Sequence, residues 1–379
     1  MTHHSRWHEA VGGHVKEKPS LLREQLWQWV QTARARLWHN PHRIGRDWRQ
    51  RLSRATAVCQ WLYVAVLVGL WLLVRLAADR WWPAIILLYG PRWMALLPQL
   101  ILIPATVLLR RRLLWLVPIA SLIAVGPWMG FCVPWPGTPA ADGRGPAVRV
   151  LTCNVDGDAL NPAQLADLVA ESQPDVVALQ EYSPKFQTAI FGKGPWSIRT
   201  DGELCVASRF PIVETKVLQN AAGWRTLGVR HELLTPHGSL FFVNLHLETP
   251  RKGLEPVLKS HLHCISELEA NLAVRRQESE AARRLTDDVD SALLIAGDFN
   301  QPTGSAIYRQ YWSQFTNAFT SAGFGFGYTK YTEGIWGGIR IDHVLGNPGW
   351  RCRRCWVGPD VGSDHRPLLA DMEWTGGDP

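Results

Sequence analysis

Leu293-Leu294-Ile295-Ala296-Gly297-Asp298-Phe299-Asn300 is an apolar run that ends in a short polar cluster. Four consecutive apolar residues of this kind are typical of a buried β-strand. Asp298 and Asn300 follow where the strand ends, so we expect their side chains to project from the edge of a sheet. A Gly-Asp pair is also common in ordinary turns, so the rest of the chain must decide between a turn and a functional site.

Three further polar clusters also end an apolar run: Leu179-Gln180-Glu181, Arg340-Ile341-Asp342-His343 and Gly362-Ser363-Asp364-His365-Arg366-Pro367. Asn154 and His246 each end another strand-like stretch. Together these residues supply the groups that metal-assisted hydrolysis of a phosphate ester requires. Hard oxygen ligands hold Mg²⁺ or Mn²⁺, amides donate to phosphate oxygens, and an imidazole beside a carboxylate handles a water proton.

Each of these residues also has an ordinary structural interpretation. Asn154 alone is typical of a turn, Glu181 of a solvated surface, and His246 of a histidine satisfied in the core. However, the chain from residue 148 to 179 reads as strand, helix and strand, with Asn161-Pro162 opening the helix. Two polar strand ends on neighbouring strands of one α/β unit favour a shared site over separate structural roles.

The six elements, in this order, resemble the endonuclease/exonuclease/phosphatase superfamily, which includes DNase I, AP endonucleases, neutral sphingomyelinases and inositol polyphosphate 5-phosphatases. The likeness spans residues 147 to 374. It implies a four-layer α/β sandwich, in which two sheets pack face to face with helices outside. It also implies a phosphoester hydrolase that depends on Mg²⁺ or Mn²⁺.

The resemblance assigns metal and substrate contacts residue by residue. Glu181 is implied as the principal metal ligand, and Asp364 completes the metal site. Asn154 is implied as an auxiliary contact to the metal or to the phosphate, and Asn300 as a phosphate contact. Arg251 lies where it could also touch phosphate, although a solvated loop explains it equally well.

The resemblance also assigns the catalytic groups. His365 is implied as the base, with Asp342 orienting it, and His246 donates to the scissile phosphate together with Asn300. Asp298 positions or activates the attacking water. Whether Asp298 or His365 accepts the water proton stays open at this point.

The N-terminal part of the chain predicts a membrane anchor. Three apolar stretches, Ala55 to Val74, Trp93 to Leu109 and Leu113 to Val133, approach or reach the roughly 20 residues that span a bilayer as a helix. Buried helices of a soluble domain would need polar faces that these stretches lack. We therefore predict a basic tail over 1–54, a three-helix transmembrane anchor over 55–133, a Pro/Gly-rich linker over 134–146 and a catalytic domain over 147–379.

Charge predicts the orientation of the anchor. Residues 1–54 hold 11 Lys and Arg against 4 Asp and Glu, and Arg110-Arg111-Arg112 separates the second and third stretches. Basic segments stay in the cytoplasm, so three crossings place the catalytic domain outside it, in a multi-pass protein of the cell membrane. Arg75, Arg80 and Arg92 in the first external loop count against this orientation.

Charge also bears on the substrate. Residues 147–379 contain 22 Lys and Arg and 27 Asp and Glu, whereas a non-specific duplex binder usually has a basic face. We therefore expect a membrane-proximal phosphodiester or pyrophosphate, with a lipid-linked substrate favoured over nucleic acid. The alternatives are an extracytoplasmic endonuclease and a non-catalytic membrane scaffold. No protein partner can be inferred, and Cys352 and Cys355 form a lone C-x-x-C that allows a local disulfide outside the cytoplasm.

Overall fold

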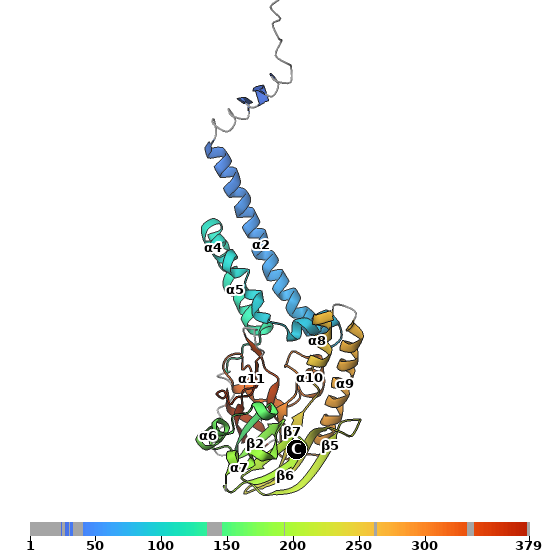
Figure 1. Cartoon of the computed structure of the whole chain (residues 1–379). Coiled ribbons are helices and arrows are strands. Elements are labelled where there is room, and N and C mark those ends of the chain that lie inside the picture. Colours follow the sequence, from blue (N-terminus) through green and yellow to red (C-terminus); the bar gives the residue numbers. More distant parts are fainter. Residues whose placement is uncertain are drawn as a thin grey trace, which may run out of the picture.

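The computed structural model describes residues 24, 27–29, 31–32, 41–134, 146–192, 194–260, 264–331 and 337–376. Most of the tail predicted before residue 41 and residues 135–145 of the predicted linker lie outside this part of the chain. Within it, a group of long apolar helices stands on one end of a β-sandwich (Figure 1).

The helical part is dominated by α2 (Pro41–Ala77), which has 37 residues and begins inside the segment predicted as tail. Helices α4 (Gln99–Leu109) and α5 (Leu116–Ile123) lie alongside it (Figure 1). Among the described residues, two segments are long and apolar enough to cross a membrane, Asp47–Ala77 and Arg92–Leu109.

In the described part of the chain, the third predicted span, Leu113 to Val133, is not one of the segments that are long and apolar enough to cross a membrane. It is helical but irregular: the 3₁₀ turn η2 (Arg111–Leu113) precedes α5, and the five-residue π-helix η3 (Ala124–Trp128) continues it. Gly126 and Pro127 lie in η3, where proline removes a backbone donor and disturbs regular α-helical hydrogen bonding. A third crossing therefore stays a prediction.

Two mixed sheets form the C-terminal part, as predicted. The first sheet has the spatial order β13 (Trp350–Val357), β14 (Leu368–Trp374), β1 (Ala147–Asn154), β2 (Val176–Gln180), β4 (Leu204–Ser208) and β3 (Ser197–Asp201). The second has the order β5 (Ile212–Gln219), β6 (Thr226–Thr235), β7 (Gly238–His246), β8 (Leu293–Asp298), β12 (Asp342–Gly346) and β9 (Thr316–Asn317). In each sheet one central pair is parallel, β1 with β2 and β7 with β8.

Helices cover the outer faces of both sheets. α6 (Pro162–Ser172) and α7 (Gln187–Phe191) pack on the first sheet, and α9 (Ile265–Arg283) and α10 (Ala306–Tyr311) on the second. α8 (Arg251–Ser260) packs beside α9, and the short helix α11 (Ala318–Ala322) contacts β12 and β13. The predicted start of α6 is confirmed, since the Asn161 side chain accepts from the backbone N–H groups of Ala163 and Gln164.

The core between the sheets explains why the strands read as apolar runs. Val150 and Val176 of the first sheet share one buried cluster with Phe242 and Leu294 of the second. Polar contacts cross this layer near the functional edge at Asn244: its Oδ1 accepts from Gln180 Nε2 at 2.7 Å, and its Nδ2 donates to the carbonyls of Leu179 and Cys205 at 3.0 and 3.1 Å. Buried apolar faces on both sides of each sheet give the expected four layers.

The helical part and the sandwich are in direct contact. Ile85 of α3 (Trp82–Tyr89) is buried against Leu254, Val257 and Leu268 of α8 and α9. On the other side, Cys132 and Gly325 exchange two backbone hydrogen bonds of 2.8 and 3.0 Å. The sandwich is therefore held directly against the end of the helices that lies near Arg75. Cys352 and Cys355 are free thiols in the structure.

Candidate active site

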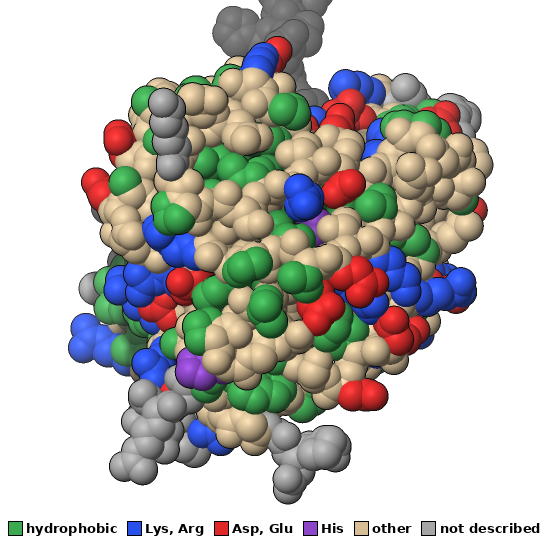
Figure 2. All heavy atoms as spheres, turned by 90° about the horizontal axis from the view of Figure 1, so that it is seen from below, with side chains coloured by type: hydrophobic (Ala, Val, Ile, Leu, Met, Phe, Trp, Pro, Cys, Tyr) green, Lys and Arg blue, Asp and Glu red, His purple; other side chains and the backbone are tan. Residues whose placement is uncertain are grey.

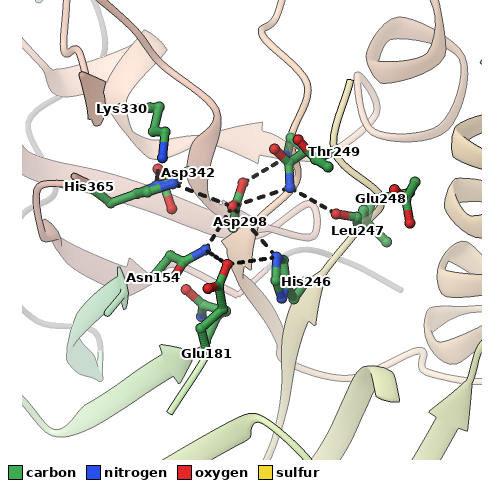
Figure 3. A network of polar contacts seen from close by, with 12 residues as sticks. Asn154, Glu181, His246, Leu247, Glu248, Thr249, Asp298, Lys330, Asp342 and His365 are labelled. Carbon is green, nitrogen blue, oxygen red and sulfur yellow. Dashed lines mark hydrogen bonds and ion pairs between the residues drawn. The ribbon is translucent and has the colours of Figure 1, made fainter. Parts of the chain in front are cut away.

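The strand register brings the predicted residues to one edge of the sandwich. Asn154 lies opposite Gln180 in the parallel pair β1–β2, so Glu181 follows directly beside it. In the second sheet, Asp298 lies opposite His246 of β7 and opposite Asp342 of β12. The two sheets thus deliver their polar strand ends to a common centre (Figure 3).

Asp298 lies in the middle of this centre (Figure 3). Its Oδ1 accepts from the backbone N–H of Asn300 at 2.8 Å, and its Oδ2 accepts from Asn154 Nδ2 at 3.2 Å. The same Oδ2 lies 3.9 Å from His246 Nε2 and 3.7 Å from His365 Nε2. One carboxylate therefore joins the residues contributed by both sheets.

The backbone conformation explains why glycine is required at position 297, at the end of β8. Gly297 has φ 138°, and a Cβ there would lie 2.0 Å from the carbonyl oxygen of Leu245. Glu181 and Asn300 both take left-handed conformations, with φ of 52° and 51°. Such backbone costs of order 1–3 kcal/mol per residue and is concentrated at functional sites. Only glycine fits the first of these positions, and the other two turn their side chains away from the strand direction.

Asn154 and Asn300 act as donors to carboxylates and carbonyls in this arrangement. Asn154 Nδ2 donates to Glu181 Oε1 at 2.8 Å, while Asn154 Oδ1 accepts from the backbone of Asp156. Asn300 Nδ2 donates to the carbonyl of Leu247 at 2.8 Å. Both amides are held in fixed orientations. Their predicted contacts to metal or phosphate stay predictions.

His365 and Asp342 form the expected pair. His365 Nδ1 lies 2.8 Å from Asp342 Oδ2, and the exposed fractions of the two side chains are 4% and 0%. Ser363 fixes the segment, because its Oγ accepts from the backbone N–H of His365 and its hydroxyl donates to the carbonyl of Asn154. With Nδ1 bonded to a carboxylate, Nε2 is the nitrogen that faces Asp298.

Burial and neighbouring charges move the pKa values of this centre in different directions. Burial raises the pKa of Asp298 to about 7, and the charge of Asp342 adds to the rise. Burial lowers the pKa of His246 to about 4, so its imidazole is neutral near pH 7. For His365, burial acts against the charged form, but Asp342 and Asp298 outweigh it and raise the pKa to about 9. The titratable groups of the centre therefore have well-separated pKa values, which allows them to take different roles as acid and base.

The oxygen-rich side of the centre suits a hard divalent cation. Glu181 is flanked by Asp298, through their shared contact with Asn154, and its side chain is 37% exposed. Asp364 Oδ1 lies 3.8 Å from His365 Nε2, and Arg251 reaches Asp364 at 4.0 Å. Asp298, Asp342 and His365 form a further buried group whose donor atoms lie within 4.8 Å of one another. Carboxylate oxygens without thiolates fit the ligand preference of Mg²⁺ or Mn²⁺.

Three residues near the centre were not predicted from the sequence. Asp156 lies close enough to Asp364 and Glu181 for their charges to raise its pKa, after the larger effect of burial. Lys330 of the short strand β10 (Lys330–Tyr331) forms an ion pair with Asp364. Tyr89 of α3 donates its hydroxyl to the carbonyl of Asn300 at 3.1 Å. Asp156 could have been predicted as a site residue, because it follows the same strand end as Asn154. Lys330 and Tyr89 lie in segments whose sequence gives no such indication.

The sequence of this chain matches the model of a known protein family. The model of the endonuclease/exonuclease/phosphatase family matches residues 151–365, which is more than half of the chain. The chain belongs to the endonuclease/exonuclease/phosphatase family. Membership establishes a hydrolase of the nuclease or phosphatase kind, and the matched range contains all the predicted catalytic residues.

Several solved structures of endonuclease/exonuclease/phosphatase type are similar to the chain. A family protein from Bacteroides thetaiotaomicron is 15% identical, covers 61% of this chain and 99% of its own, and gives a TM-score of 0.47. An AP endonuclease from Archaeoglobus fulgidus is 16% identical over 59% and 98%, with a TM-score of 0.47. Truncated Caenorhabditis elegans TDP2 is 18% identical over 60% and 98%, with a TM-score of 0.46. No curated protein sequence matches significantly.

Proposed function

We propose that this family member is a membrane-anchored phosphoester hydrolase that uses Mg²⁺ or Mn²⁺ and acts on a phosphodiester or pyrophosphate presented at the membrane surface. The observation that carries the proposal is the hydrogen bond from Tyr89 to the carbonyl of Asn300, at 3.1 Å. Tyr89 is the last residue of α3, which lies between the two candidate spans, and Asn300 belongs to the catalytic centre. The contact supports an active site that faces the membrane.

The proposed chemistry is attack of a water molecule on phosphorus. His365 accepts the water proton at Nε2, and Asp342 holds Nδ1 and offsets the positive charge that forms on the ring. Asp298 orients the water, since its carboxylate faces Nε2 of His365 at 3.7 Å. Neutral His246 donates to a phosphoryl oxygen, where negative charge grows in the transition state. The Asn300 amide would do the same after exchanging its longer hydrogen bond, of 3.3 Å to Asp298 Oδ2, for one to the substrate.

The assignment of the base to His365 follows from its surroundings. A pKa of about 7 would also let Asp298 take up a proton near neutral pH. However, Asp298 Oδ2 already accepts from two amides, at 3.2 and 3.3 Å, whereas His365 Nε2 has no hydrogen-bond partner among the described residues. We therefore favour His365 as base and Asp298 as the group that positions the water.

Glu181 and Asp364, with the side-chain oxygen of Asn154, would hold the divalent cation, and Asp156 is a further carboxylate beside them. When bound, the cation would offset charge on the phosphate and lower the pKa of a coordinated water. Arg251, with a side chain that is 59% exposed, would contact the substrate from the rim.

The overall charge of the sandwich supports a lipid-linked substrate over nucleic acid. On the face that points away from the helices, opposite the proposed membrane side, Lys and Arg side chains lie interspersed with Asp and Glu (Figure 2). Residues 147–379 carry 22 basic and 27 acidic side chains. Binding to a nucleic-acid backbone draws most of its free energy from neutralising phosphates, which needs a continuous basic surface. A substrate delivered by the membrane does not need one.

A parallel assay of the full chain in detergent micelles tests this function. Undecaprenyl pyrophosphate, sphingomyelin and supercoiled plasmid DNA are each incubated with the protein and Mg²⁺, with the His365→Ala variant as control. We expect hydrolysis of one of the lipids, lost in the variant and in EDTA, and intact plasmid. Nicking of the plasmid while both lipids stay intact would refute the proposal and support the endonuclease alternative.

A further inference from the structure

A cleft lies between the helical anchor and the sandwich, beside the catalytic centre. Tyr89, Arg92, Trp93 and Met129 line it from the anchor, and the segment from Phe326 to Lys330 lines it from the sandwich. Its interior volume is about 100 Å³, and one side of it is open to solvent, so it would enclose only part of a ligand. Neither part of the protein forms this cleft alone.

The cleft and the catalytic centre share residues. Lys330 lines the cleft and forms an ion pair with Asp364 of the centre. Tyr89 also lines the cleft, and its hydroxyl donates to Asn300. A ligand in the cleft would therefore lie directly beside the residues that carry out the proposed hydrolysis.

The cleft contains cations without carboxylate partners. Arg92 donates from Nε and Nη2 to the carbonyl of Leu88, at 3.2 and 2.8 Å, and from Nη1 to the carbonyl of Trp128 at 2.9 Å. Arg340 donates to Cys132 Sγ and Thr320 Oγ1, each at 3.4 Å, and its guanidinium lies over the Phe319 ring, 4.6 Å from the centroid. Among the described residues, no carboxylate oxygen lies within 4.0 Å of either guanidinium. Partly buried charge without a partner is costly, so an anionic ligand is the expected complement.

Apolar side chains line part of the cleft beside these cations, next to a candidate membrane span. Trp93 and Met129 face the cleft from the anchor, and Phe326 stacks on Tyr328 with ring centroids 5.2 Å apart on the opposite side. Arg92 is also the first residue of the candidate span Arg92–Leu109. The cleft thus begins where a spanning helix would leave the bilayer, and an apolar chain could pass from it along that helix into lipid.

We infer that this cleft binds the phosphate-bearing head of a membrane lipid. The phosphate lies toward Arg92 and Lys330, and the first part of the apolar chain lies against Trp93, Met129 and Phe326. The inference rests on the proposed function and narrows it, because it makes the anchor part of the substrate site. Lipid phosphates are then favoured over soluble ones by the contact with the chain.

Binding of farnesyl pyrophosphate, measured by isothermal titration calorimetry, tests the inference. The full chain carries His365→Ala throughout, so that turnover does not consume the probe. Arg92→Gln removes the charge, Met129→Trp fills the cleft while leaving the charge, and Arg80→Gln removes an exposed arginine of the same loop outside the cleft. Thermal denaturation of each variant shows whether it is folded.

We expect Arg92→Gln and Met129→Trp to weaken binding at least about tenfold, and Arg80→Gln to leave it unchanged, since a charged hydrogen bond is worth about 1.5–3 kcal/mol. Farnesol and inorganic pyrophosphate should bind more weakly than farnesyl pyrophosphate. Equal affinity of all folded variants would overturn the inference. Arg92→Gln could unfold the helical part, because it removes the hydrogen bonds of Arg92. In that case Met129→Trp, which keeps Arg92, still tests the inference.

Kinetics with active protein separate this inference from the proposed function. In an otherwise wild-type chain, Arg92→Gln and Met129→Trp should raise KM for the lipid substrate more than KM for bis(p-nitrophenyl) phosphate, which has no lipid chain. If all variants cleave lipid phosphates with equal KM, the inference that the cleft binds the lipid is wrong, while the proposed hydrolytic function is supported. Binding of farnesyl pyrophosphate that depends on Arg92, without cleavage of any lipid phosphate, would support the cleft and refute the function.

Discussion

Asp79 and Arg275 form a buried ion pair that joins the turn after α2 to α9, with Asp79 Oδ1 3.5 Å from Arg275 Nη1 and side-chain exposures of 0% and 1%. Asp79 Oδ2 also accepts from the backbone N–H of Ala306 at 2.7 Å, at the start of α10. The guanidinium of Arg275 in turn contacts the Tyr89 hydroxyl. The helical part is thus joined to the sandwich by a polar network that ends at Asn300.

Breaking this pair should destabilise the whole protein. Asp79→Asn leaves the guanidinium of Arg275 buried without a counter-charge, which costs about 3–5 kcal/mol. Thermal unfolding of the full chain measures the loss, and Glu255→Ala, which removes the exposed pair with Lys259 of 3.2 Å, is the control and should cost at most about 1 kcal/mol. Equal effects of the two variants would show that the buried pair does not hold the parts together.

Replacing the proposed base should affect turnover more than substrate binding. His365→Ala should lower kcat about 10²- to 10⁴-fold with little change in KM, because the proton moves only in the transition state. Asp342→Asn should cost less, and the double variant should be barely slower than His365→Ala, since the two residues act as one unit. Steady-state kinetics on the lipid substrate measures these effects. If the loss of kcat in the double variant equals the product of the two single losses, Asp298 is the group that accepts the water proton.

The same pair should give the protein a pH-dependent stability. In the folded protein the pKa of His365 is raised from 6.5 to about 9, despite burial, by Asp342 and Asp298. A raised pKa stabilises the fold fully below the unfolded value, and this contribution is lost as pH rises through the folded value. Asp342→Asn should therefore destabilise the metal-free protein more near pH 6 than near pH 10.

Nuclear magnetic resonance of the histidine ring nitrogens can follow this titration directly. The His365 signal should titrate above 6.5 in the wild-type protein without divalent cations and at a lower pH in Asp342→Asn. A base must be neutral to act, so the hydrolysis rate should rise with pH through this titration. An unchanged His365 titration in the variant would show that Asp342 does not set it.

Removing Glu181, the proposed principal metal ligand, should weaken metal binding. Glu181→Ala takes away a hard oxygen ligand, so Mn²⁺ binding measured by electron paramagnetic resonance should weaken and hydrolysis should fall sharply. Glu171→Ala, an exposed carboxylate on α6, is the control and should bind Mn²⁺ as the wild type does. Full hydrolytic activity in EDTA would rule out the metal-dependent mechanism.

The orientation of the anchor predicts an extracytoplasmic C-terminus. Alkaline phosphatase folds to its active form only outside the cytoplasm, so a fusion after Pro379 should be active in a bacterial host. A fusion to a cytosolic reporter at the same position should be inactive. The opposite pair of results would reverse the topology and would mean that Arg75, Arg80 and Arg92, not the basic tail, set the orientation.

Much of the site could be predicted because its signals are local. An apolar strand followed by Asp298 and Asn300, or by Glu181, shows in a few residues that polar groups leave a sheet edge. The buried strands, the helix capped by Asn161 and the first two apolar segments follow from the same short-range patterns. The irregular backbone of the third apolar segment could not be predicted, because the π-helical turn at Gly126 and Pro127 is not visible in hydropathy.

The amino-acid sequence by itself determined the strands, their polar ends and the chemical groups of the centre, because each depends on neighbours a few residues apart. Only the tertiary structure decided that Asp298 is central, that Lys330 pairs with Asp364, and that Tyr89 reaches Asn300 across 211 positions of the chain. Such contacts depend on how the two sheets and the helical part pack together. Their geometry is set by the buried surfaces of the whole fold, which no local pattern encodes.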